Sequence, residues 1–444
     1  MPTATTSPVA VTSGAGGIGP PPPDRATYRF AIANRADDVE LADVSTIFVE
    51  TAKISKRLSR PTECSIGFPA DHALVRTLAA DGYPIVSAGR RCLKVWSRDE
   101  VSDPWKLIAN APIWFVEDVG GEDVTTTSVT AYDQLILTRF RLARDATGNY
   151  AFPRFNVSPS SGLEGPITGP DLIKQLIDNS VFNSGPSFDY EGDIGIDTTW
   201  GEIDLVGPDV RGKLADFPKT IDEFLILVTA SGQCDIWLEP VDTSMGWPAL
   251  YKGYLNAVIN AGSTTPVHYD YGMGDHSLQE VRRSFDMDTV TNKLRFLLGP
   301  KQTHTAGRWS GSIEATNSDL ADPPQTFINS QIIASRNAFL TMQDVQIYDD
   351  GYKENEVRKV FQRLWQEQML YRAMPRQMVY ATPVRDAPFR ASSLKLGDRI
   401  TINVSDSLRE PVSGLQRVWG WDVEVDANTT EAITTLVVDP IGGA

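Results

Sequence analysis

The C-terminal part of the chain carries the pattern that most restricts its fold, a strict alternation of apolar and polar residues. Ile400, Ile402 and Val404 alternate with polar residues, and a longer alternating run follows from 419 to 426. Because successive side chains of a strand point to opposite faces, a period of two indicates strands with one buried and one wet face. Such strands are typical of antiparallel barrels and sandwiches. The predicted buried face of the second run holds Trp419, Trp421, Val423 and Val425, and its opposite face holds Asp422, Glu424 and Asp426.

The remaining secondary structure is predicted from short runs and from helical spacing. β-branched and aromatic runs dominate from 28 to 150, and the apolar run within Glu223–Thr229 has the length of a strand. Apolar residues at helical spacing predict a helix over Asp171–Val181, a short one within Asp71–Ala80 and a long one over Lys353–Met374. The predicted fold class is therefore mainly β with α+β insertions and one long helix near residues 353–374.

The length of the chain suits several domains, because 444 residues exceed what one hydrophobic core usually serves. Changes in composition divide it into four parts. Residues 1–24 form a Pro/Gly-rich arm, and residues 25–155 an N-terminal β domain. Residues 156–345 form a middle α+β domain, and residues 346–444 the long helix with the C-terminal strands.

Composition excludes several classes of protein. The formal net charge of −16 opposes binding to nucleic acid over the whole surface, because phosphates attract basic proteins. No apolar stretch approaches the roughly 20 residues that span a bilayer. The three cysteines, Cys64, Cys92 and Cys234, are too scattered for a disulfide framework and are expected to be buried thiols. We therefore expect neither a membrane span nor specific nucleic-acid binding.

Motifs that carry chemistry are incomplete in this sequence. Gly14–Gly19 matches a dinucleotide fingerprint, but four prolines follow where the helix that holds the pyrophosphate would begin. The acids from Asp189 to Asp193 resemble the start of a calcium loop that lacks its required glycine and glutamate. His268 and His276 fit no zinc pattern. The sequence thus predicts no catalytic, cofactor-binding or metal-binding residues, no cofactor and no enzyme, and it leaves open a cation site among Asp193, Asp197 and Glu202.

One contrast of charge predicts an interface. Lys353–Arg399 carries ten basic and five acidic residues, whereas Gly185–Val210 carries seven acids and no base. In a closed ring of identical subunits, one surface of each copy meets a different surface of the next. Basic elements could then meet acidic ones, although a solvated helix face explains the same charges. The candidate interface residues are Arg358, Arg363, Arg372, Arg376, Asp193, Asp197 and Glu202.

The order of four segments resembles the hub, or tail-associated minor tail, proteins of long-tailed siphovirus-type phages, especially those of actinobacteria. The first runs from Trp114 through a Gly-Gly turn to Ala131-Tyr132-Asp133-Gln134-Leu135-Ile136-Leu137-Thr138-Arg139. The second is the glycine-rich loop of 270–278 with the residues that follow to Lys293. The third is the helix of 352–374, and the fourth comprises the strands around Leu396–Thr401, Arg417–Val423 and Thr434–Val438.

This resemblance implies a structural virion protein with two barrel-like β domains of tail-hub type. Three copies would form a ring at the tail tip, assembled in the host cytoplasm. The implied partners are further copies in a homotrimer, the distal tail protein or tail tube, the tape measure protein, and other minor tail or receptor-binding proteins. The resemblance therefore implies a role in the baseplate hub and in host attachment.

An alternative function remains open at this point. A virion-borne carbohydrate-active enzyme, or a carbohydrate-binding module acting on the host cell wall, would use exposed tryptophans as sugar platforms. Trp200, Trp237 and Trp247 are the candidates, although tryptophans more often pack in a core.

Overall fold

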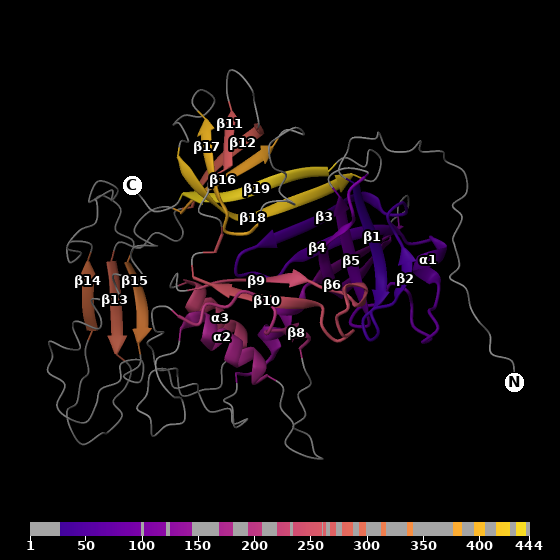
Figure 1. The fold of residues 1–444 in the computed structure, drawn as a ribbon, viewed down its shortest axis with the longest axis horizontal. Helices are drawn as coiled ribbons and strands as arrows, with labels where there is room; N and C mark the ends of the chain where they lie inside the picture. The colour runs from indigo at the N-terminus through magenta and orange to yellow at the C-terminus, as the bar shows by residue number, and fades with distance from the viewer. Residues whose placement is uncertain are drawn as a thin grey trace, which may run out of the picture.

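The computed structural model describes most of the N-terminal half of the chain and separate segments of the C-terminal half. The described residues are 27–98, 102–120, 125–143, 168–180, 194–206, 220–230, 234–259, 261–262, 267–271, 278–286, 293–298, 312–316, 335–340, 376–383, 395–404, 414–426 and 432–440. Strands predominate among them, which confirms the mainly β class (Figure 1). The predicted helix of 353–374 lies outside the described residues, and the predicted domain boundaries stay predictions.

One sheet of 13 strands joins the two ends of the chain. Its main path runs in the order β12-β16-β19-β18-β3-β4-β7-β6-β5-β1-β2, and β11 and β17 extend it beside β18. The strands from the N-terminal half are β1 (Thr27–Asn34), β2 (Glu40–Asp43), β3 (Val49–Arg57), β4 (Glu63–Pro69), β5 (Arg91–Arg98), β6 (Lys106–Gly120) and β7 (Thr125–Tyr132). The others are β11 (Val267–Tyr271), β12 (Leu278–Asp286), β16 (Arg376–Pro383), β17 (Arg399–Val404), β18 (Leu415–Asp426) and β19 (Ala432–Pro440).

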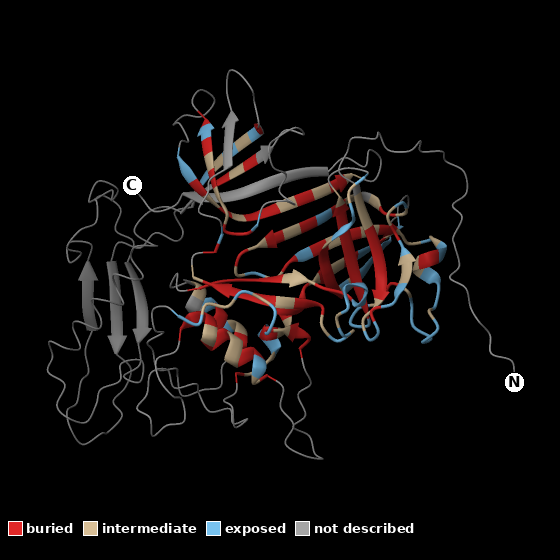
Figure 2. Ribbon diagram, in the orientation of Figure 1, coloured by how far each residue is buried: buried red, intermediate tan, exposed pale blue. Residues whose placement is uncertain are grey.

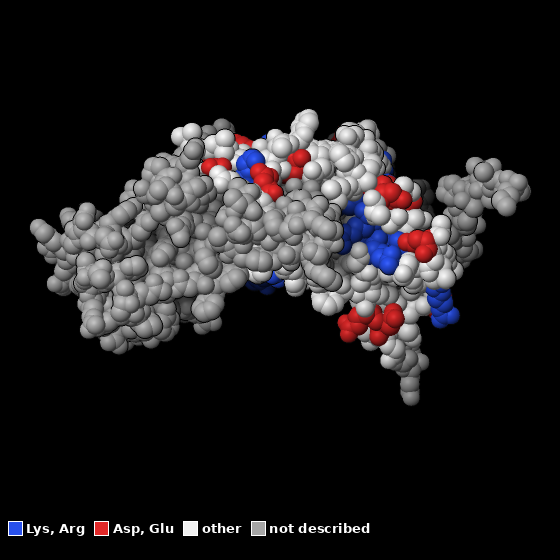
Figure 3. Space-filling model, turned by 90° about the horizontal axis from the view of Figure 1, so that it is seen from below, with Lys and Arg blue, Asp and Glu red and all other residues white. Residues whose placement is uncertain are grey.

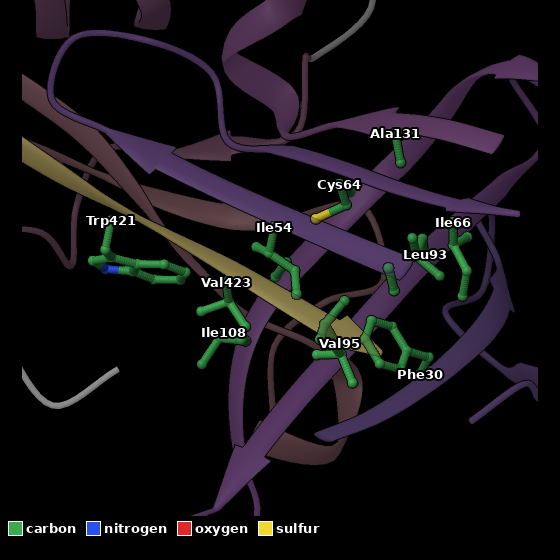
Figure 4. Close-up of a cluster of buried hydrophobic side chains, with 14 of the residues drawn as sticks. Phe30, Ile54, Cys64, Ile66, Leu93, Val95, Ile108, Ala131, Trp421 and Val423 are labelled. Atoms are coloured by element: carbon green, nitrogen blue, oxygen red, sulfur yellow. The ribbon is translucent and has the colours of Figure 1, made fainter. Parts of the chain in front are cut away.

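The junction between the two halves is the antiparallel pair of β18 and β3, in which Val423 lies opposite Ile54. The buried faces of these strands share one hydrophobic core, which Figure 2 shows along the centre of the sheet. In Figure 4, Trp421 and Val423 from β18 lie beside Ile54 from β3 and Ile108 from β6. The C-terminal strands therefore complete the core of the N-terminal strands, although more than 300 residues separate them in sequence.

The alternation predicted for β18 is confirmed in its second half and shifted in its first. Trp421, Val423 and Val425 are buried, and the acidic residues between them are half-buried. The register between β18 and β19 shifts between Val418 and Gly420, so Val418 is buried and Trp419 is only partly so. The expectation that Trp419 shares the buried face is wrong, because the extra residue of a β-bulge reverses the alternation. A Cβ at Gly420 would lie 2.4 Å from the carbonyl oxygen of Lys56, so the irregular segment needs glycine there.

Two helices cover a second, smaller sheet. Strands β8 (Ile196–Asp197), β10 (Gly253–Val258) and β9 (Asp235–Pro240) form this sheet in that order. Helix α2 (Gly169–Asp178) begins at Thr168, whose hydroxyl accepts a hydrogen bond from the Asp171 amide, and this confirms the helix predicted over Asp171–Val181. The short helix predicted within Asp71–Ala80 is a single turn, α1 (Ala73–Arg76). Apolar residues of α2 and of the sheet form a second core.

The segment predicted as a strand over Glu223–Thr229 is instead helix α3 (Ile221–Ala230), and the prediction is wrong. Thr220 and Glu223 form a reciprocal cap: the Glu223 carboxylate accepts from the Thr220 amide at 2.8 Å, and the Thr220 hydroxyl accepts from the Glu223 amide at 3.4 Å. This capping box satisfies two amides that a helix start otherwise leaves unpaired. Its Thr-x-x-Glu signature precedes the apolar run and favours a helix over a strand. A third sheet, β14 (Ser312–Thr316), β13 (Lys293–Leu298) and β15 (Ser335–Leu340), completes the described strands.

Candidate functional site

The structure describes only part of the predicted charged interface. Asp197 ends β8, and its Oδ1 accepts hydrogen bonds from the Thr199 amide at 2.8 Å and the Trp200 amide at 3.1 Å. Glu202 is exposed, and its amide donates to the side chain of Asn256. Arg376 begins β16, where the backbone is described. Asp193, Arg358, Arg363 and Arg372 lie outside the described residues, so the pairing of basic and acidic segments stays a prediction.

A cluster of buried charges connects the large sheet to the sheet of β8, β10 and β9. The Asp38 carboxylate, in the turn after β1, accepts from the Lys94 ammonium of β5 at 2.8 Å and from the Lys252 ammonium at 2.9 Å. Lys252 directly precedes β10 and Asp242 follows β9, so this cluster spans two sheets. Asp242 lies 3.6 Å from Lys94, and the four charged side chains are between 0 and 3% exposed.

Hydrogen bonds complete this cluster, which we call the Asp38 cluster (Asp38, Lys94, Asn110, Asp242 and Lys252). The Thr243 amide donates to Asp38 at 3.0 Å, and the Asn110 amide group donates to the Val241 carbonyl at 2.7 Å. Burial acts to raise the pKa of Asp38, but the bonds from Lys94 and Lys252 outweigh it and the pKa is lowered. Asp38 is therefore charged at neutral pH, and two carboxylates balance two ammonium groups in the interior.

The sequence contains no pattern that indicates the Asp38 cluster. Its charged members are separated by up to 214 residues, and each resembles an ordinary surface charge in its own segment. Asp38 itself adopts a φ of 63°, a left-handed conformation that aspartate tolerates better than most residues. Three further ion pairs, Lys56–Glu239, Arg417–Asp235 and Arg57–Asp422, link strands that are distant in sequence.

A second buried carboxyl lies at Asp133, within the segment that carries the first part of the resemblance. Asp133 begins the 3-10 helix η1 (Gln134–Phe140), and its oxygens accept from the Leu135 amide at 3.0 Å and the Thr62 amide at 2.8 Å. Burial raises its pKa to about 6, although these hydrogen bonds and the charge of Lys56 act in the opposite direction. The carboxyl joins the end of β7 to the loop before β4, so its role is structural.

The raised pKa of Asp133 predicts a defined pH dependence. Because the folded pKa of about 6 exceeds the ordinary value of 3.8, the folded protein holds a proton in this window that the unfolded chain has lost. The contribution of Asp133 to the free energy of unfolding therefore falls as pH rises from about 4 to 6, by roughly 3 kcal/mol in total. We expect Asp133→Asn to remove this pH dependence. The free energy of unfolding of the variant, relative to that of the wild type, should therefore increase as pH rises over this range. Urea unfolding at several pH values measures the difference, and a difference independent of pH would contradict the prediction.

The cysteines in the described part of the chain have a structural role. Cys64, Cys92 and Cys234 are free and buried, as predicted, and burial raises the pKa of Cys92 to about 12. Among the described residues, no group of three or more His, Cys, Asp or Glu side chains could hold a metal ion. No described helix is long and apolar enough to cross a membrane. Figure 3 shows basic and acidic groups side by side on the described part of one face.

Two open grooves lie on the described surface. The larger, of about 570 Å³, is lined by side chains that include Arg35, Arg90 and Gln134. The smaller, of about 350 Å³, crosses the wet face of β4, β3 and β18, where Lys53 pairs with Glu424 at 3.0 Å. Of the tryptophans considered as sugar platforms, Trp237 is buried and donates to Glu239, whereas Trp200 is exposed and Trp247 half-buried beside it.

No family model and no curated protein matches the sequence. Solved structures do match. A tail protein from Neisseria meningitidis is similar over 93% of this chain and 97% of its own, with a TM-score of 0.50 and 12% identity. A 43 kDa tail protein of prophage MuSo2 from Shewanella oneidensis is similar over 93% of this chain and 98% of its own, with a TM-score of 0.47 and 9% identity.

A third similar structure comes from a secretion machine. It is an Escherichia coli component of the type VI secretion system with structural similarity to the T4 bacteriophage tail proteins gp27 and gp5. The similarity covers 89% of this chain and 74% of that protein, with a TM-score of 0.41 and 8% identity. The structural neighbours of this chain are thus phage tail proteins and related secretion components. At 12% identity, the likeness to the Neisseria protein establishes that this chain has the fold of a tail protein.

Proposed function

We propose that this chain is a structural protein of the virion, the trimeric hub of a siphovirus-type tail tip. Three copies form a ring that joins the tail tube to the distal tail protein, the tape measure protein and the receptor-binding components. The observation that carries this proposal is the shared fold with a tail protein over nearly the full length of both chains. The long continuous sheet and the buried charges between sheets support a rigid building block.

The proposed ring predicts threefold density at the tail tip. Intact tails should show three copies of this chain, arranged head to tail around the tail axis, because a heterologous contact that closes gives a cyclic ring. Cryo-electron microscopy of tails, with the chain located by antibody labelling, is the measurement. The isolated chain can remain monomeric before assembly, so the tail is the decisive sample. Sixfold or single-copy density at this position would refute the trimer.

The same proposal predicts that the purified chain does not hydrolyse cell-wall polymers. Several described charges form ion pairs between strands that are distant in sequence, as at Arg57–Asp422 and Lys56–Glu239, and these pairs hold the strands together. We expect no release of reducing sugar from peptidoglycan or arabinogalactan. Reproducible turnover that one Asp or Glu substitution abolishes would overturn this expectation and favour a glycosidase.

A further inference from the structure

Four aromatic side chains gather beside the sheet of β8, β10 and β9. This sheet lies below the large sheet in Figure 1. The ring of Tyr254 from β10 stacks on Trp247, with centroids 5.9 Å apart and planes at 14°. Trp200 meets the same indole at 5.4 Å and 62°, and Tyr251 meets it at 6.4 Å. Trp200 is 75% exposed, the most of any large aromatic in the described core and surface. The other three rings are half-buried, so the cluster presents one exposed indole supported by aromatic neighbours.

The turns that carry the two indoles are held in place before any ligand arrives. Asp197 fixes the turn of Trp200 through bonds to the Thr199 and Trp200 amides. In the same turn, a Cβ at Gly201 would lie 1.5 Å from the Leu255 carbonyl oxygen, so the backbone of this turn rests directly on β10. The turn of Trp247 follows η3 (Thr243–Met245), which Asp242 caps through the Met245 amide at 3.2 Å. A preorganised surface pays little entropy on binding.

Carboxylates flank the aromatic rings on both sides. In the sheet of β8, β10 and β9, Tyr254 lies opposite Asp197 of β8 and opposite Glu239 of β9. The three side chains therefore lie on the same face of this sheet. Burial raises the pKa of Tyr254, and the charge of Glu239 adds to this effect. Glu239 is itself fixed by the Trp237 indole at 2.9 Å and the Lys56 ammonium at 3.0 Å, and each oxygen retains a second lone pair.

We propose that this surface, the aromatic corner (Trp200, Trp247, Tyr251 and Tyr254), binds a neutral saccharide. A sugar ring presents an apolar face of C–H groups, which packs on an indole, and hydroxyl groups at its edge, which donate to carboxylates. The exposed indole of Trp200 and the half-buried indole of Trp247, beside Asp197 and Glu239, offer both. The acids disfavour phosphorylated or acidic polymers, because like charges repel in a confined site. This proposal does not rest on the hub assignment, since a monomeric chain carries the complete surface.

The test begins with the purified full chain on an array of neutral and acidic oligosaccharides, followed by isothermal titration with the strongest neutral binder. We expect saturable binding to neutral saccharides and a shift of tryptophan fluorescence. Trp200→Ala and Trp247→Ala should each lower the affinity about tenfold or more, the loss of one aromatic contact. Trp105→Ala is the matched control, because Trp105 is 40% exposed directly before β6, away from the aromatic corner, and Arg98 lies over its ring.

Four results would overturn the proposal. The first is an array on which no neutral saccharide binds, and the second is a preference for acidic saccharides. The third is saccharide binding that both Trp200→Ala and Trp247→Ala leave unchanged. If the two variants instead abolish association between copies of the chain, the aromatic corner is a protein interface and the saccharide assignment is wrong. Circular dichroism of both variants verifies that they are folded.

Discussion

Asp38→Asn is expected to destabilise the folded chain by about 3–5 kcal/mol, because it leaves buried ammonium groups without their counter-charge. Asparagine keeps the shape of the side chain and tolerates the left-handed backbone at this position. Both oxygens of Asp38 accept hydrogen bonds, so the change removes the charge together with one accepting oxygen. Lys94 and Lys252 would then face Asp242 alone, and only Lys94 lies within 4 Å of it. Unfolding in urea, followed by circular dichroism, measures the loss.

Two further variants make this prediction specific. Asp37→Asn changes an exposed neighbour that accepts only the Val39 amide, and we expect it to alter stability by less than about 0.5 kcal/mol. Adding Lys252→Met to Asp38→Asn should recover part of the loss, because one ammonium then remains opposite one carboxylate. A loss for Asp38→Asn no larger than that for Asp37→Asn would contradict the role of the Asp38 cluster.

Trp421→Ala is expected to cost roughly 3–5 kcal/mol and to prevent ring assembly. The side chain is 4% exposed and packs in the core where β18 joins β3, so its loss opens a cavity between the two halves of the chain. Stability is measured by urea unfolding, and assembly by incorporation of the variant into tails.

Trp419→Ala provides the control within the same strand. Trp419 lies at the irregular register of Val418–Gly420, where it is only partly buried at the margin of the core. We expect it to cost less than half as much as Trp421→Ala. Equal losses would show that the two indoles contribute alike, in conflict with the observed register.

The sequence was sufficient wherever a pattern was local. Alternation identified the strands at 399–404 and 421–426, and the apolar spacing after Pro170 identified α2. The capping box at Thr220 and Glu223 was also present in the sequence, but the length of the apolar run suggested a strand. The capping box predicts the observed helix, because its two hydrogen bonds form within the first helical turn.

The candidate sites show the same division. Trp200 and Trp247 could be named from the sequence as exposed platforms, but their contact at 5.4 Å depends on how the turn after β8 lies on β10. Trp237, an equal candidate by sequence, is buried and bonds to Glu239. Burial is a property of the packed neighbours, and the residue type alone does not determine it.

The sequence by itself determined the mainly β class and the alternation along the second half of β18, because these depend on residue types at short spacing. Tertiary structure alone decided the pairing of β18 with β3, the irregular register that exposes part of Trp419, and the meeting of Asp38 with Lys94 and Lys252. The physical reason is that these contacts join residues far apart along the chain. Their energies depend on register, burial and the arrangement of sheets, none of which a local pattern specifies.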